Sequence, residues 1–241
     1  LHEKRLPPTG KELIVIMVLV IIPGLLIARQ PDLGTSLLVI AAGLMVVFLS
    51  GIPFRYIFSL IILCIPTSLL LWKFMKDYQR QRVLTLINPD TDPLGAGYNI
   101  IQSKIAMGSG GIFGKGWTNG SQVQLEFLPE KNTDFIFAVV GEEFGLFGVL
   151  TILTLYILII GRGLYIASNA SDLYGRLLAG SISLTFFVYV FVNTAMVIGL
   201  MPIVGIPLPL ISYGGTSMVT LMIGFGMLMS INSNRKLVAK K

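Results

Sequence analysis

Long apolar runs alternate with short polar segments along the chain, and this pattern predicts a bundle of membrane-spanning helices. A helix needs roughly 20 apolar residues to cross the ~30 Å hydrocarbon core of a bilayer. About six runs come near that length: Leu13–Ala28, Leu33–Gly51, Tyr56–Trp72, Phe135–Ile160, Leu177–Met201 and Leu210–Ile231. The sequence therefore predicts an all-α, polytopic membrane fold in a single integral membrane domain, residues 1–241, with a large loop over residues 73–133 between the third and fourth spans.

The positions of lysine and arginine orient these spans, because short cytoplasmic loops collect positive charge whereas long translocated loops escape that bias. With both termini in the cytoplasm, the short inner segments hold ten of the bases: Lys4, Arg5, Lys11, Arg55, Arg162, Arg176, Arg235, Lys236, Lys240 and Lys241. We therefore expect the loop 73–133 on the outer face of the membrane.

Composition supports the membrane assignment and excludes several kinds of site. Hydrophobic residues make up 54% of the 241 residues and charged residues only 12%, about half the charged fraction of a soluble domain. Cys64 is the single cysteine and His2 the single histidine, so neither an intramolecular disulfide nor a metal site built from Cys and His is expected.

The net charge of +6 fits cytoplasmic segments that bind anionic membrane lipids, and no nucleic-acid partner is expected. Leu1 in place of Met indicates a fragment or a processed product.

A glycine-rich stretch in the large loop, GSGGIFGKG at residues 108–116, comes close to a nucleotide-binding loop without matching it. That loop requires G-x-x-x-x-G-K-[ST]. Ser109 stands where the first glycine belongs and Gly116 replaces the final hydroxyl residue. On an outer face, where ATP is not available, the stretch instead suggests a cradle for some other anionic group.

The residues just before this stretch predict a helix. Ile100, Ile101, Ile105 and Met107 recur at helical spacing in Tyr98–Met107. We expect an amphipathic interfacial helix that ends at the glycine turn, with Lys104 on it and Lys115 beyond it.

The start of the fourth span carries carboxylates. Asp134 directly precedes the apolar run, a position that favours a helix N-cap, and Glu130 lies just before it. Glu142 and Glu143 follow eight and nine residues later, roughly 12–13 Å deeper along a helix, where carboxylates usually face a polar cavity.

Three glycines on one helical face predict close approach of a neighbouring helix: Gly141, Gly145 and Gly148.

The segment of residues 202–217 is apolar but too rich in proline and glycine for a plain helix. Broken backbone at membrane depth occurs only where it is buried in protein or lines a cavity. We therefore expect a re-entrant or broken element that faces the Asp134 helix end.

Five strings of this sequence carry a resemblance to a known family: QPDLGTS, YQRQRV, DPLGAGYNIIQSKIAMGSGG, FLPEKNTDFIFAVVGEEFGLFG and GIPLPLISYGGTS. Together they resemble the SEDS family of bacterial cell-wall proteins, and its RodA branch more than its FtsW branch. The resemblance implies an inner-membrane peptidoglycan glycosyltransferase that polymerises lipid II in cell elongation and works with a class B penicillin-binding protein. Family members have about ten spans, and the spans here look like the C-terminal six.

The same resemblance implies roles for individual residues. The acidic residue that the family uses for catalysis falls on Asp134 in the string TDF. In the reaction that the family implies, a sugar hydroxyl attacks an anomeric carbon and undecaprenyl pyrophosphate leaves, so Asp134 suits the general base. Residues expected to face the substrate are Gln102, Lys104, Ser109, Gly110, Gly111, Lys115, Glu130 and Ser212. Stabilisation of the departing pyrophosphate suits Lys104, Lys115 and the backbone amides of the glycines. A divalent cation such as Mg²⁺ or Mn²⁺ could share this task, although the sequence shows no dedicated cluster of metal ligands.

Other interpretations remain open at this point. Asp134 can act only as a helix cap, the glycine stretch only as a turn, and Lys104 and Lys115 only as solvated charges. Glu142 and Glu143 can simply bond neighbouring helices. Transporters also place broken helices and buried carboxylates around a cavity, so a lipid II flippase shares these features, and a non-catalytic membrane scaffold is a third alternative.

Overall fold

The computed structural model describes most of the chain: residues 7–30, 32–53, 55–56, 58, 62, 66, 72–73, 75–92, 95–125, 127–128 and 130–233. Most of the expected third span, Tyr56–Trp72, lies outside these residues together with Cys64. His2 and the C-terminal residues 234–241 lie outside them as well.

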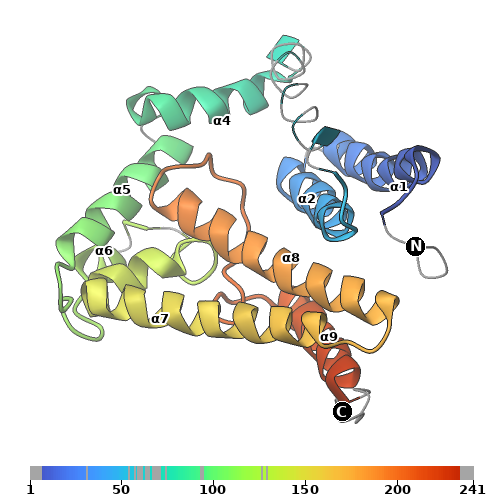
Figure 1. The fold of residues 1–241 in the computed structure, drawn as a ribbon. Coiled ribbons are helices and arrows are strands. Elements are labelled where there is room, and N and C mark those ends of the chain that lie inside the picture. Colours follow the sequence, from blue (N-terminus) through green and yellow to red (C-terminus); the bar gives the residue numbers. More distant parts are fainter. Residues whose placement is uncertain are drawn as a thin grey trace. The chain divides into compact units, whose positions relative to one another are not determined.

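Every regular element within the described residues is helical (Figure 1). The elements are α1 (Gly10–Arg29), α2 (Leu33–Leu49), α4 (Asp77–Ile87), the short η1 (Pro89–Thr91), α5 (Ala96–Ser109), α6 (Ser121–Gln124), α7 (Ile136–Ser168), α8 (Leu173–Val197) and α9 (Gly215–Ser233). Four of them, α1, α7, α8 and α9, are long and apolar enough to cross a membrane, and α2 is a shorter apolar helix. The predicted all-α, polytopic membrane fold is therefore confirmed.

Several helix ends differ from the apolar runs that predicted them. The helix α7 continues to Ser168, past the end expected at Ile160, because the charge of Arg162 ends an apolar run but does not break a helix. The last helix begins at Gly215 and not at Leu210. Residues 202–214 form no helix, as expected for a segment in which prolines remove backbone donors.

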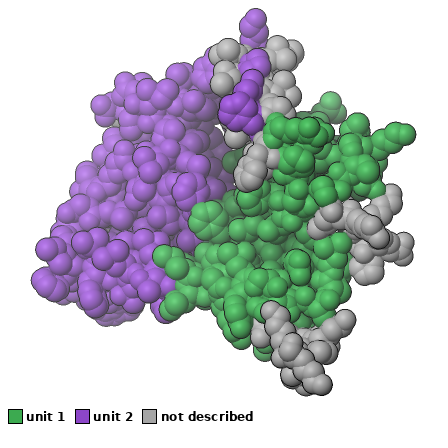
Figure 2. All heavy atoms as spheres, viewed as in Figure 1, with its two compact units in different colours: residues 1–56, 156–189, 215–241 green, residues 57–155, 190–214 purple. Residues whose placement is uncertain are grey.

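The chain forms two compact units, which Figure 2 shows in different colours. Unit 1 comprises Leu1–Tyr56, Tyr156–Tyr189 and Gly215–Lys241. Its helices α1 and α2 pack closely through small residues, since a side chain at Gly24 or Gly43 would overlap Ile40 or Val20.

Unit 2 comprises Ile57–Leu155 and Val190–Gly214 and holds every described residue that we expected at a functional site. Its helix α5 confirms the helix expected over Tyr98–Met107. Ile100, Ser103 and Ala106 form the buried face of α5, and the Ser103 hydroxyl donates to the carbonyl of Val197 at 2.9 Å. This contact packs α5 against the C-terminal end of α8.

Candidate active site

Asp134 lies in a turn that leads into α7. The turn closes through backbone hydrogen bonds from Thr133 and Phe135 to the Glu130 carbonyl, at 3.2 and 3.1 Å. The Thr133 hydroxyl also donates to a carboxylate oxygen of Glu130, at 2.8 Å. Phe135 and Phe137 are buried and anchor the turn in the core of unit 2. The turn therefore places the carboxylates of Glu130 and Asp134 in one short segment.

Buried Asn193 of α8 joins this turn to the broken segment. Its side-chain amide donates to the Asp134 carbonyl at 2.8 Å and to the Ile206 carbonyl at 2.7 Å. A single side chain thus satisfies two carbonyls that belong to irregular backbone. Gly205, next in the broken segment, lies beside the carboxylate, since a Cβ there would be 3.6 Å from Asp134 Oδ2.

Ser212 makes a second connection between the same two segments. Its buried hydroxyl donates to the Thr133 carbonyl and accepts from the Leu208 amide, the latter at 2.7 Å. The Tyr213 amide adds a bond to the Asn132 carbonyl at 2.9 Å. These contacts bring residues 205–213 of the broken segment to the turn that carries Asp134, whereas the last three residues of the expected segment 202–217 already belong to α9. In this structure the Ser212 hydroxyl therefore binds the backbone of the Asp134 turn, through the carbonyl of Thr133.

The Asp134 carboxylate is itself half-buried and pairs with no other described side chain. α7 begins at Ile136, so Asp134 precedes the N-cap position, and no described hydrogen bond makes its side chain a cap. Burial raises the pKa of Asp134, and the nearby negative charge of Glu130 raises this pKa further. These effects oppose the lowering that a helix N-terminus would cause. A raised pKa makes the carboxylate a better proton acceptor once it is ionised.

Lys104 projects from the exposed side of α5 over Gly199, just beyond the end of α8. A Cβ at Gly199 would overlap the lysine Cε, and Gly199 has a φ of 72° that glycine adopts without strain. The carbonyl end of a helix favours a nearby cation. Asn193, which bonds the Asp134 turn, lies six residues before Gly199, roughly 9 Å along a helix. The C-terminal end of α8 therefore contacts both Lys104 and the Asp134 turn.

The glycine-rich stretch 108–116 forms hydrogen bonds with a break in α7, a structural role that the sequence did not reveal. α7 is broken at Gly145, whose φ of 63° and ψ of −159° are not helical. The amides of Leu146 and Phe147 donate to the carbonyls of Gly111 and Ile112, at 2.9 and 3.1 Å. In return, the amides of Lys115 and Gly116 donate to the carbonyls of Glu142 and Glu143, both at 3.0 Å. The loop thus replaces helical hydrogen bonds that the break removes.

Packing against the break explains the glycines themselves. A Cβ at Gly110 would overlap the Gly141 carbonyl, and one at Gly145 would overlap the loop backbone. Gly141 packs on Met107 of α5. The close neighbour at Gly141 and Gly145 is therefore α5 with its following loop. A Cβ at Gly148 would meet Phe144 and Val140 of α7 itself, so the three glycines do not share one packing face as the sequence predicted.

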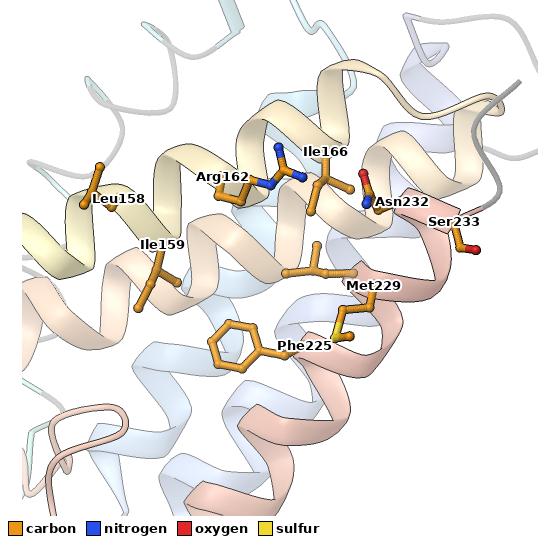
Figure 3. Close-up of a pocket in the computed structure, with 9 residues that line it drawn as sticks. Leu158, Ile159, Arg162, Ile166, Phe225, Met229, Asn232 and Ser233 are labelled. Carbon is orange, nitrogen blue, oxygen red and sulfur yellow. The ribbon is translucent and has the colours of Figure 1, made fainter. Parts of the chain in front are cut away.

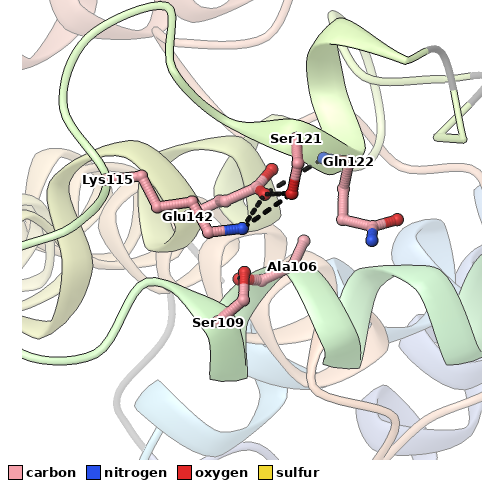
Figure 4. Close-up of polar contacts among 6 residues, drawn as sticks. All are labelled: Ala106, Ser109, Lys115, Ser121, Gln122 and Glu142. Carbon is pink, nitrogen blue, oxygen red and sulfur yellow. Dashed lines mark hydrogen bonds and ion pairs between the residues drawn. The ribbon is translucent and has the colours of Figure 1, made fainter.

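Lys115 is paired with Glu142 inside this junction (Figure 4). The lysine Nζ lies 2.7 Å from Glu142 Oε1 and 2.8 Å from the Ser121 hydroxyl. The Gln122 amide donates to the same Glu142 oxygen at 3.0 Å. The side chain of Glu142 is 0% exposed and that of Lys115 is 29% exposed. These contacts favour a structural role for Lys115 over the pyrophosphate contact expected from the sequence.

The structure therefore divides six of the expected site residues into two groups, and the other three, Gln102, Lys104 and Ser109, lie on α5. Asp134, Glu130 and Ser212 belong to one turn and its anchor. Gly110, Gly111 and Lys115 belong to the junction with the break in α7. Ser109 ends α5, where its hydroxyl donates to the Ala106 carbonyl at 2.9 Å, and Gln102 is partly buried on α5.

Asn193 is the residue that sequence reasoning missed. It is 0% exposed and reaches two segments distant in sequence. The available signal was an asparagine within the apolar run FVYVFVNTAMV, because polar side chains within a membrane helix are costly and usually serve a contact.

The described residues hold no group of three or more His, Cys, Asp or Glu side chains placed to bind a metal ion. Glu130 and Asp134 offer two carboxylates in one turn. A divalent cation held there would need further oxygen ligands, which the phosphates of a substrate can provide.

Comparisons with known proteins identify the relatives of this chain. The family model described as "Cell cycle protein", for FtsW, RodA and SpoVE, matches residues 2–237. The peptidoglycan glycosyltransferase MrdB of Escherichia coli K12 is 57% identical over 235 residues, which is 97% of this chain and 64% of that protein. The chain thus spans slightly less than two thirds of that relative.

Two solved structures show a similar fold. One is a chain from work on "structural coordination of polymerization and crosslinking by a peptidoglycan synthase complex", with a TM-score of 0.77, 34% identity and coverage of 95% of this chain and 64% of that one. The other is the rod shape determining protein RodA of Thermus thermophilus, with a TM-score of 0.65, 27% identity and coverage of 98% and 61%.

Proposed function

This chain belongs to the FtsW, RodA and SpoVE family of cell cycle proteins, and we propose that it forms part of a peptidoglycan glycosyltransferase that polymerises lipid II during cell elongation. The names of its relatives support this proposal: peptidoglycan glycosyltransferase for MrdB and rod shape determining protein for the Thermus protein. The protein lies in the inner membrane, with both termini of this chain in the cytoplasm and residues 73–133 outside, as the distribution of Lys and Arg favours.

Asp134 is the general base of the proposed reaction. It takes the proton of a sugar hydroxyl while that oxygen bonds to the anomeric carbon of a second lipid-linked sugar. The bond from the anomeric carbon to phosphate breaks, and undecaprenyl pyrophosphate leaves with the electron pair. A positioned base contributes roughly 10²–10⁴ in rate.

One observation carries this assignment. The Asp134 carboxylate is half-buried, its pKa is raised by burial and by Glu130, and no described side chain pairs with it. Its backbone, in contrast, is fixed by Asn193, and the neighbouring Thr133 by Ser212. A fixed turn that carries an unpaired carboxylate of raised pKa suits proton abstraction, and no described hydrogen bond gives this carboxylate a structural task.

Lys104 is the residue we assign to the leaving pyrophosphate. It is exposed, has no ion pair with another described residue, and lies at the end of α8 whose Asn193 bonds the Asp134 turn. Lys115 is not assigned this role, because Glu142 and Ser121 already bind its ammonium. Gln102, on the same helix as Lys104, and Glu130 complete the proposed substrate-facing surface.

A class B penicillin-binding protein is the proposed partner. The similarity to a chain of a peptidoglycan synthase complex supports an assembly of this kind.

The decisive experiment compares polymerisation with translocation. Purified full-length protein is incubated with lipid II and the partner, without any other glycosyltransferase, and glycan chains are resolved by length. We expect polymer from the wild-type protein, and a markedly higher lipid II requirement for Lys104→Met. Transfer of lipid II across vesicle membranes without polymer would support a flippase and overturn the proposal.

A further inference from the structure

A cavity of about 740 Å³ lies in unit 1 between the C-terminal parts of α7 and α9 (Figure 3). Its volume is in the range of small-molecule sites, about 300–1,000 Å³. No residue of the Asp134 turn or of the Lys115 junction lines it. The chemistry of this cavity therefore needs its own explanation.

The polar residues of the lining lie toward the helix ends, where the apolar side chain of Ile166 also lines the cavity. Leu158 and Phe225 lie ten and eight residues before the last residues of α7 and α9, roughly 15 and 12 Å along the helix axes. Arg162 lies six residues, roughly 9 Å, from the end of α7. Asn232 and Ser233 are the last residues of α9. A ligand that fits this lining has an apolar tail and a polar head.

The positive charge of Arg162 favours a ligand whose polar head is negatively charged. Arg162 is exposed, and no ion pair joins it to another described residue. Its guanidinium carbon lies 5.3 Å from the ring centroid of Tyr165. An arginine beside an exposed tyrosine near a helix end is typical of the level of lipid headgroups. An arginine also binds phosphate oxygens through two parallel hydrogen bonds.

We propose that this cavity binds an anionic phospholipid, with one acyl chain against Leu158, Phe225 and Met229 and the phosphate on Arg162. In the orientation favoured by the positive charges, the lipid belongs to the cytoplasmic leaflet, where basic pockets between membrane helices bind anionic headgroups. The inference does not depend on the proposed polymerase activity, because it uses only the cavity and its lining.

The test uses the delipidated full-length protein and phosphatidylglycerol that carries a photoreactive group on one acyl chain. We expect labels on peptides from 158–166 and 225–233. Arg162→Gln should weaken labelling about tenfold or more, since it removes charged hydrogen bonds. Arg176→Gln is the matched control, because Arg176 is also exposed near a helix end in unit 1 but lies outside the cavity.

A second pair of variants tests the apolar part. Leu158→Trp should obstruct the apolar part of the cavity and weaken labelling, whereas Ile157→Trp, at an exposed neighbour outside the lining, should not. Inorganic phosphate in excess should fail to compete, which distinguishes a lipid from a free phosphate. Equal labelling of the Arg162 and Arg176 variants would overturn the proposal. Absence of label from these peptides in the wild-type protein would overturn it as well, and is the result expected if another part of the longer protein fills the cavity.

Discussion

The ammonium of Lys115 lies 2.7 Å from the carboxylate of Glu142, whose side chain is completely buried. Glu142 belongs to the last turn before the break in α7, and Lys115 belongs to the loop that supplies hydrogen bonds to that break. The ion pair therefore fixes the loop between α5 and α6 to the membrane helix that follows the Asp134 turn.

Removing the lysine alone should destabilise the protein strongly. Lys115→Met leaves Glu142 buried without its counter-charge, which typically costs about 3–5 kcal/mol. The double variant Lys115→Met, Glu142→Leu should recover much of this loss. Thermal unfolding of the full-length protein in detergent measures the effect, and Lys104→Met, which breaks no described ion pair, is the control. If Lys115 instead binds substrate, its variant keeps the stability of the wild-type protein and loses affinity for lipid II, and the second substitution restores nothing.

Gly145 provides a sharper test of the broken helix. Gly145→Ala places a Cβ at a φ of 63° and against the loop backbone, so we expect a loss of at least about 1–3 kcal/mol from backbone strain. Gly161→Ala in the same helix is the matched control, because a Cβ there meets nothing within 4 Å, and alanine favours a helix. A Gly145→Ala protein that unfolds at the same temperature as the Gly161→Ala protein would contradict the break.

The sequence predicted α1, α2, α5, α7, α8 and α9, although not all of their ends, because apolar runs and helical spacing are local features of the chain. The third span expected over Tyr56–Trp72 lies outside the described residues. It did not predict the break at Gly145, since the apolar pattern of α7 continues through it and the loop that replaces its hydrogen bonds is distant in sequence. It also gave no partner for Lys115, because Glu142 lies 27 residues away. Asn193 was missed for the same reason: its two carbonyl partners belong to segments 59 and 13 residues away. Topology, domain organisation and substrate contacts stay predictions.

The raised pKa of Asp134 predicts a pH dependence. A base must be ionised, so the polymerisation rate should fall as the pH is lowered through this pKa. Glu130→Gln removes the negative charge that contributes to the shift but keeps an oxygen that can accept from Thr133. The pKa of Asp134 should then fall, although burial still raises it, and the acidic limb of the rate profile should move to lower pH.

Glu130→Asp keeps the charge and is the control for this experiment. Initial rates over a pH series, with lipid II saturating, give the limb for each variant. An acidic limb that stays in place, or moves to higher pH, in the Glu130→Gln protein would show that Glu130 does not act on the Asp134 carboxylate.

Asp134→Asn tests the central claim most directly, because it keeps the size of the side chain and removes the base. The measurement is the rate of glycan formation from lipid II by the full-length protein with its penicillin-binding partner, together with lipid II affinity and the unfolding temperature. We expect the rate to fall by roughly 10²–10⁴, with affinity and stability close to those of the wild-type protein. A near-normal rate in the Asp134→Asn protein would contradict the assignment of Asp134 as the catalytic base.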